Sequence, residues 1–115
     1  NPLLLKGQLH GGIVQGAGQA LMENIVYDPG NGQMLSGSFL DYCMPKADDF
    51  CSFEVMSNPV PAKTNPLGIK GAGEAGTTGA LPAVMNAVNH ALEARGIRHL
   101  EMPLTSEKVW RALHS

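Results

Sequence analysis

Glycine is the residue type that most constrains how this sequence can fold. Of its fourteen glycines in 115 residues, five lie between positions 7 and 18 and five between positions 68 and 79. A glycine lets another backbone or a ligand approach closely, or adopts a backbone conformation that other residues avoid. We therefore expect close packing or ligand binding at these two stretches.

Residues 7–24 are predicted to form a helix, because apolar residues recur there at spacings of three and four. Each interior glycine destabilises a helix by about 1 kcal/mol relative to alanine, so the five glycines need a compensating contact. Gly12, Gly16 and Ala20 are spaced by four and form one ridge of small residues. This ridge favours tight packing against another backbone.

The same stretch allows a second interpretation, in which its glycine-rich N-terminal turns offer backbone amides to an anionic or polar ligand. Glutamine side chains, which both donate and accept hydrogen bonds, would then contribute to the site. The candidates are Gln8, Gln15 and Gln19. His10 is interpreted as a hydrogen-bonded structural histidine and not as a metal ligand, because no second ligand lies four residues away.

The second stretch, residues 70–79, contains the candidate catalytic group. Lys70 and Glu74 are the only charged residues between positions 64 and 92. A carboxylate that is shielded from water and has no close positive partner is suited to act as a base. The structural alternative is an exposed Glu74 in a glycine-rich connection that leads into a helix.

Residues 71–76 also fit the G-x-G-x-x-G pattern of dinucleotide-binding loops, which is weak evidence alone. The apolar run before the loop, residues 67–70, is short for a first strand. The chain also lacks room for the remaining strands of a doubly wound sheet. A dinucleotide-binding module that uses Gly71 to Gly76 is therefore the less favoured alternative.

The predicted fold class is α+β, with three helices packed on a small, mostly antiparallel sheet in a single domain or domain fragment, residues 1–115. The further helices are expected at 78–95 and, after a Thr105 cap, up to Leu113. The strands are expected at 25–27, 33–35, 52–58 and 97–102. Phe39, Tyr42, Met44 and Trp110 are expected to pack.

Composition excludes several classes of protein. The net charge is −2 and no basic run occurs, so nucleic-acid binding is not indicated. No apolar stretch approaches the roughly 20 residues of a membrane-spanning helix. The charged fraction of 16% is below the usual value of about 25%, which suggests a surface covered by other chains. Cys43 and Cys51, eight residues apart, match no metal signature. Reduced thiols in a cytoplasmic protein are expected, and a disulfide between the two is the alternative.

Four segments in order resemble the large subunits of molybdenum hydroxylases. They are GQLHGGIVQGAGQAL from Gly7 to Leu21, DYCMP from Asp41 to Pro45, NPLGIKGAGEAG from Asn65 to Gly76, and MPLT from Met102 to Thr105. The family includes xanthine dehydrogenase, aldehyde oxidase and aerobic-type carbon monoxide dehydrogenase. Ala75-Gly76 after the glutamate looks closer to the carbon monoxide dehydrogenase-like bacterial branch.

The resemblance implies a role for each matching residue. Glu74 matches the catalytic glutamate, which acts as a base beside molybdenum during oxidation of a small substrate with water-derived oxygen. Gln8 matches a glutamine that hydrogen-bonds molybdopterin, and Gln15 is a second candidate. Gly71 and Gly73 would keep the backbone clear of the cofactor. No residue of this chain is expected to bind the metal directly.

The resemblance also implies what lies outside these residues. The cofactor, in its cytosine dinucleotide form, would be bound largely by the remaining part of the large subunit, so the chain alone should be inactive. Iron–sulfur clusters and FAD would be carried by partner subunits. The opening at Asn1 without Met suggests a fragment or a processed chain. The alternative from another functional class is a non-catalytic interaction module or remnant.

Overall fold

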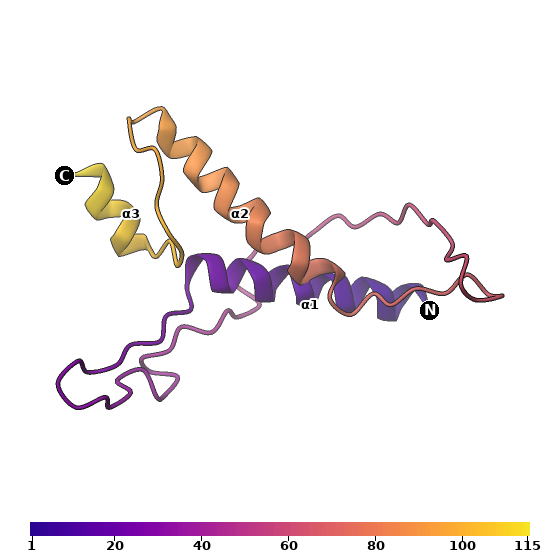
Figure 1. Cartoon of the computed structure of the whole chain (residues 1–115), viewed down its shortest axis with the longest axis horizontal. Coiled ribbons are helices and arrows are strands. Elements are labelled where there is room, and N and C mark those ends of the chain that lie inside the picture. The colour runs from indigo at the N-terminus through magenta and orange to yellow at the C-terminus, as the bar shows by residue number, and fades with distance from the viewer.

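The computed structural model describes all 115 residues and contains three helices, α1 (Pro2–Leu21), α2 (Ala75–Glu93) and α3 (Ser106–Leu113) (Figure 1). A connection of 53 residues, 22–74, runs between α1 and α2 and leaves the helices as two wide loops. None of the helices has the length and apolar character needed to cross a bilayer.

Helix α1 begins five residues before its predicted start. Asn1 caps it, because its side-chain oxygen accepts a hydrogen bond from the Leu3 amide at 3.0 Å. Pro2 suits the first turn, where no amide proton is required. Gly7 and Gly11 therefore lie inside the helix, where backbone amides bond to carbonyls of the preceding turn. The expectation that these glycines offer N-terminal amides to a ligand is wrong.

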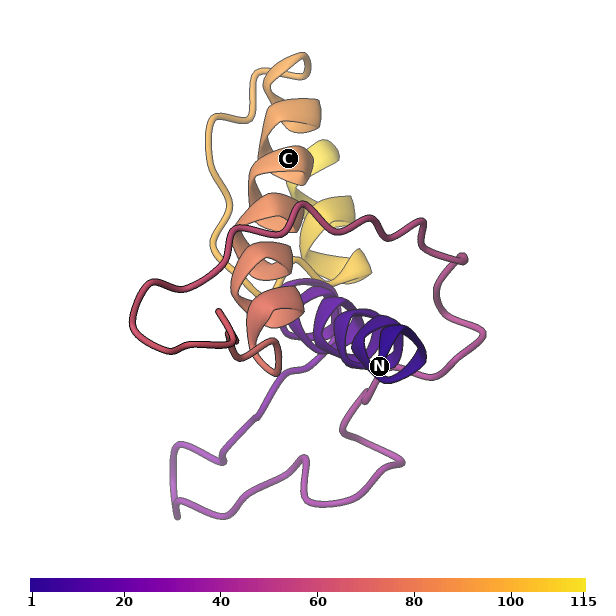
Figure 2. The ribbon, with the colours of Figure 1, turned by 90° about the vertical axis from the view of Figure 1, so that its right-hand side faces the viewer.

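Helix α2 crosses α1 at the predicted ridge of small residues (Figure 2). A Cβ atom on Gly76 would lie 2.6 Å from the Leu9 carbonyl oxygen and 2.8 Å from the Ile13 nitrogen. A Cβ on Gly16 would lie 2.9 Å from that of Ala80. The two backbones meet at a distance that only glycine permits, which confirms the packing interpretation of the ridge.

The C-terminal end of α1 joins two other parts of the chain. The Pro45 ring occupies the space where a Gly18 side chain would be. The carbonyl of Ala20, one of the last four in the helix, accepts a hydrogen bond from the Leu104 amide at 2.6 Å. Leu104 is only 3% exposed. This end of α1 therefore holds the 22–50 loop and the segment before α3.

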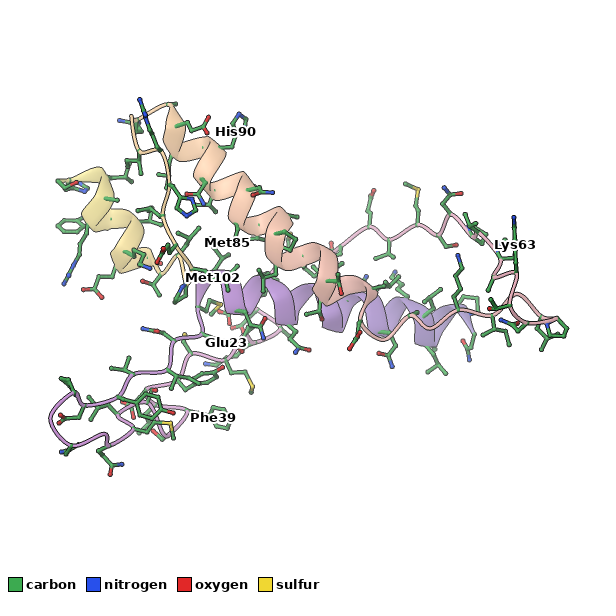
Figure 3. The ribbon with its side chains drawn as sticks, in the orientation of Figure 1. Glu23, Phe39, Lys63, Met85, His90 and Met102 are labelled. Atoms are coloured by element: carbon green, nitrogen blue, oxygen red, sulfur yellow. The ribbon has the colours of Figure 1, made fainter.

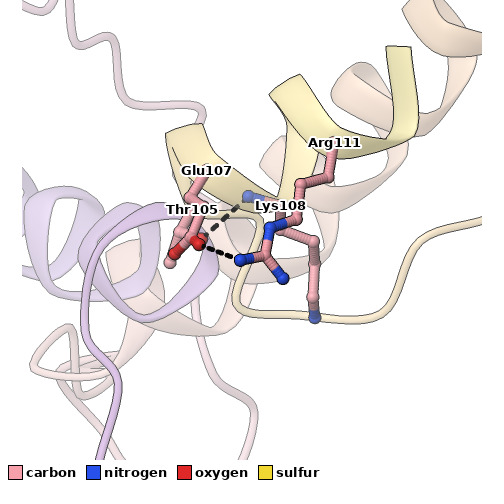
Figure 4. A network of polar contacts seen from close by, with 4 residues as sticks. All are labelled: Thr105, Glu107, Lys108 and Arg111. Atoms are coloured by element: carbon pink, nitrogen blue, oxygen red, sulfur yellow. Dashed lines mark hydrogen bonds and ion pairs between the residues drawn. The ribbon is translucent and has the colours of Figure 1, made fainter. Parts of the chain in front are cut away.

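Helix α3 is held by several polar contacts, of which the sequence indicates the Thr105 cap. Thr105 caps it as predicted, since its hydroxyl accepts a hydrogen bond from the Lys108 amide at 3.3 Å (Figure 4). The Arg111 guanidinium pairs with Glu107 at 2.6 Å one turn earlier. The connection to α2 is fixed by Asn89, whose side chain bonds both the amide and the carbonyl of Leu100.

The predicted sheet is absent, so the α+β assignment is wrong. The only β pairing is an isolated bridge between Tyr27 and Met34, within the predicted hairpin. Residues 52–58 and 97–102 form no strand. A strand needs a neighbour with which to exchange backbone hydrogen bonds, and the chain supplies none for either segment. The alternating pattern of residues 52–58 predicts a strand, but no other segment of the chain lies beside these residues to pair with them.

The molecule has almost no core of its own. Ten of its 115 residues are buried, and the accessible surface of 8952 Å² compares with about 6,000 Å² for a folded monomer of this mass. The radius of gyration is 17.8 Å, where about 13 Å is usual. Predicted packing is therefore wrong for Phe39, which is 78% exposed on its loop (Figure 3), and for Trp110, which stacks only on His114. Met44 is exposed as well, and Tyr42 is half-buried.

We expect replacement of Gly76 by alanine to lower the free energy of unfolding by about 1–3 kcal/mol, because the new methyl group overlaps the backbone of α1. Gly79, in the same helix, is the matched control. A Cβ there meets nothing within 4 Å, so Gly79→Ala should be neutral or stabilise by up to about 1 kcal/mol. Urea titration of both variants measures the difference, and equal effects would contradict the proposed close contact.

A second prediction concerns pH. Desolvation, the negative charge of Glu23 and a hydrogen bond to its carboxylate together raise the pKa of Tyr42 above its usual value. The stabilisation from this contact is present below about pH 10 and is lost as pH rises through the raised pKa. In a Tyr27→Phe background, Glu23→Gln should lower the midpoint of the phenol absorbance titration. An unchanged midpoint would show that Glu23 does not act on Tyr42.

Candidate functional site

Glu74 lies at the N-terminal boundary of α2, immediately before Ala75. Its backbone carbonyl accepts a hydrogen bond from the Thr78 amide at 3.0 Å, which begins the helix. Its side chain makes no capping bond and takes part in no other hydrogen bond or ion pair of the chain. The positive end of the helix dipole lies beside the carboxylate. Glu74 is thus held by its backbone while its carboxylate remains available.

Glu74 is exposed to solvent, as the structural alternative predicted, and the expectation of a shielded carboxylate is wrong for this chain. Low charge around a residue in the sequence does not bury it, because shielding requires side chains packed over it. The chain leaves this face open. Any exclusion of water from Glu74 must come from atoms outside these 115 residues.

Glu74 borders an open depression of about 570 Å³ at the crossing of α1 and α2. Gln15 reaches it from α1, while Gly73 and Glu74 contribute from the loop before α2. The remaining wall comes from the first two turns of α2, namely Thr77, Thr78, Leu81 and Pro82. The crossing of the helices therefore brings an amide side chain from position 15 to the same depression as the carboxylate from position 74.

A second depression, of about 600 Å³, continues from the first along α1. The two share Gln15 and Gly73, and the second adds Gln8 together with Gly7 and Gly11. A Cβ on either of these two glycines would meet no atom within 4 Å, so the absence of side chains leaves the floor of the depression open. We call the two depressions together the amide groove.

The amide groove unites four of the five residues to which the family resemblance gives a role, namely Gln8, Gln15, Gly73 and Glu74. Gly71 lies elsewhere, in a hollow formed with the proline-rich segment of residues 57–61. Its proposed role beside the cofactor therefore has less geometric support than that of Gly73. Thr77 also lines the groove and was not predicted from the sequence, although a hydroxyl next to a glycine of a close helix crossing is a recognisable signal.

Hydrogen-bonding capacity in the groove comes from side chains and from the loop before α2. Gln8 and Gln15 are exposed and have no partner in the chain. The backbone amides of residues 71–74 also donate no hydrogen bond. A ligand that carries both donors and acceptors, or negative charge near the loop, fits this arrangement. The groove contains one negative charge and no positive side chain.

Two other candidates lie outside the amide groove. The ring of His10 packs edge-on against Phe53 with 5.6 Å between centroids, and its buried Nε2 atom has no hydrogen-bond partner. The expectation of a fully hydrogen-bonded histidine is thus wrong for this nitrogen. Cys43 and Cys51 are free and exposed. No group of three or more histidine, cysteine or acidic side chains could hold a metal ion.

The chain is similar to several known proteins. A model described as a molybdopterin cofactor-binding domain matches residues 1–51. The large subunit of nicotine 6-hydroxylase from Paenarthrobacter nicotinovorans is 44% identical over 112 residues, which cover 97% of this chain and 14% of that protein.

Two solved structures share the fold over the whole of this chain. A copper- and molybdenum-containing carbon monoxide dehydrogenase superposes with a TM-score of 0.91 at 32% identity, over 15% of its own chain. Quinoline 2-oxidoreductase from Pseudomonas putida 86 superposes with a TM-score of 0.89 at 35% identity, over 14% of its chain. The 115 residues therefore span about one seventh of the length of these relatives, and they belong to the molybdenum hydroxylase family, matching a segment of its molybdopterin-binding large subunit.

Proposed function

We propose that this chain contributes the catalytic base, Glu74, and one wall of the cofactor site to a molybdenum-dependent oxidoreductase. The observation that supports it most directly is the unpaired Glu74 carboxylate at the edge of the amide groove. The Glu74 carboxylate makes no capping bond and pairs with no cation of the chain, and the helix N-terminus beside it favours a negative charge. It is therefore free to contact a group that the groove receives.

The hydrogen-bond donors and acceptors that line the groove suit molybdopterin. Gln8 and Gln15 would hydrogen-bond the pterin, whose ring and amide atoms both donate and accept. The free amides of Gly73 and its neighbours would face negatively charged parts of the cofactor, and Gly71 would keep the backbone clear. We propose the cytosine dinucleotide form on the family resemblance. When bound, the cofactor would supply the acceptor for the two electrons removed from the substrate, and iron–sulfur and flavin subunits would carry these electrons onward.

Glu74 would accept a proton from the oxygen nucleophile that water provides, which makes that oxygen more reactive towards the substrate carbon. A general base works well where water is excluded, and this chain alone leaves Glu74 exposed. The isolated 115 residues are therefore expected to be inactive. Catalysis would require the remaining part of the large subunit to cover the amide groove.

The surface of the chain supports the proposal that it works only together with the remaining part of the large subunit. Its accessible area exceeds that of a compact monomer of equal mass by about 3,000 Å², which is within the range of obligate interfaces. Large apolar side chains are exposed on it, such as Leu4, Leu40 and Met56 at 66%, 97% and 93%. We propose that the remaining part of the large subunit covers these side chains and that the complex functions in the cytoplasm.

For the substrate, we propose a small molecule oxidised by the carbon monoxide dehydrogenase-like branch of the family. Within that branch, an aromatic nitrogen heterocycle is favoured over carbon monoxide. The nicotine 6-hydroxylase subunit is 44% identical and quinoline 2-oxidoreductase 35%, against 32–34% for the carbon monoxide dehydrogenases. The walls that select the substrate lie mostly outside this chain.

In the assembled enzyme, Glu74→Gln should abolish turnover while molybdenum content stays at the level of the unchanged enzyme. The amide keeps the size of the side chain but cannot accept the proton. Because no contact within the chain is lost, the free energy of unfolding should change by less than about 1 kcal/mol. Turnover is assayed with nicotine, quinoline and carbon monoxide, and molybdenum is measured by elemental analysis.

Glu93→Gln, at the other end of α2 and also exposed, is the matched control and should retain full activity. Turnover that persists in the Glu74→Gln enzyme would exclude Glu74 as the base. An assembled complex that contains no molybdenum would instead favour the non-catalytic interaction module. The dinucleotide-binding alternative lacks the strand that must precede its glycine loop.

A further inference from the structure

The hydroxyl of Thr77 forms the one side-chain hydrogen bond between α1 and α2. It donates to the carbonyl oxygen of Gly12 at 3.0 Å, in a partly buried position, and joins residues 65 positions apart. The acceptor carbonyl has two lone pairs, so it can take this bond in addition to its helical one. The Thr77 backbone nitrogen would lie 2.9 Å from a Cβ on Gly12, so no larger residue at position 12 would allow this approach.

At a crossing lined by glycines, a directional bond of this kind is needed to fix the register, which is the position of one helix along and around the other. Interlocking side chains normally fix how two helices slide and rotate against each other. At this crossing the facing residues are Gly12, Gly16, Gly76 and Ala80, whose surfaces provide little that interlocks. A directional hydrogen bond at the centre restricts both movements. Thr77 therefore determines the register that the glycines make possible.

The two ends of this bond are each one turn away from a proposed functional residue. Glu74 precedes Thr77 by three residues at the start of α2, and Gln15 follows Gly12 by three residues on α1. Glu74, Gln15 and Thr77 all line the same depression. A shift of α2 along α1 would change the separation of the carboxylate from the glutamine amide.

We propose that Thr77 is a positioning residue, which holds Glu74 at its working distance from Gln15 and the bound cofactor through the hydrogen bond to Gly12. The proposal rests on the proposed function, since it assumes that Glu74 is the base. Misplacement of a reacting group by about 1 Å can reduce a rate roughly 100-fold. Loss of the bond should therefore slow the chemical step more than it weakens substrate binding.

The test compares Thr77→Val, which keeps the shape and removes the hydroxyl, with Thr77→Ser, which keeps the hydroxyl, in the complete enzyme. We expect kcat to fall at least 10-fold in Thr77→Val with KM and molybdenum content unchanged, and to recover to within about 3-fold of the unchanged enzyme in Thr77→Ser. If the Thr77→Val enzyme does not assemble, Thr77→Ala, which also lacks the hydroxyl, replaces it in the comparison with Thr77→Ser. Thr105→Val removes the cap of α3, away from the amide groove, and should leave kcat unchanged.

Amide hydrogen exchange provides a readout that does not depend on activity. Peptides that cover residues 9–16 and 74–80 should exchange faster in Thr77→Val, with and without cofactor, and return to the original rates in Thr77→Ser. Unchanged kcat in Thr77→Val, an equal loss in Thr77→Ser, or loss of molybdenum from Thr77→Val would each overturn the positioning role. An active Glu74→Gln enzyme would instead contradict the proposed function itself.

Discussion

The close approach of two glycine-lined backbones is the contact on which the rest of this structure depends. Gly76 on α2 meets the backbone of α1 at Leu9 and Ile13, and neither Gly76 nor the facing Gly12 has space for a side chain. Half of the ten buried residues are alanine or leucine, and most of the others are glycine. Stability therefore comes from many short backbone contacts at one crossing and not from a conventional apolar core.

The same crossing creates the amide groove. Helices that pack through large side chains lie farther apart, and the amide of Gln15 would then lie farther from the carboxylate of Glu74. Glycines that face away from the crossing, such as Gly7 and Gly11, leave the groove floor open. One residue type thus serves two purposes on the same helix, with packing on one face and clearance for a ligand on another.

The sequence predicted the features that depend on local pattern. Spacing of Gly12 and Gly16 indicated the close packing, and Thr105 indicated the start of α3. The early start of α1 could also have been recognised from Asn1 and Pro2, which are a capping residue and a first-turn residue. The predicted strand at residues 52–58 and the predicted shielding of Glu74 were both wrong, because a local pattern does not show whether a pairing strand or covering side chains lie elsewhere in the chain.

The most direct test of this account is an experimental structure of the complete large subunit with its cofactor bound. We expect the pterin to lie along the amide groove, with Gln8 and Gln15 in contact with it. We also expect the Glu74 carboxylate to lie within hydrogen-bond reach of the reacting end of the cofactor, directly or through one water molecule. A cofactor bound on another face of α1, with Glu74 still directed into solvent, would contradict it.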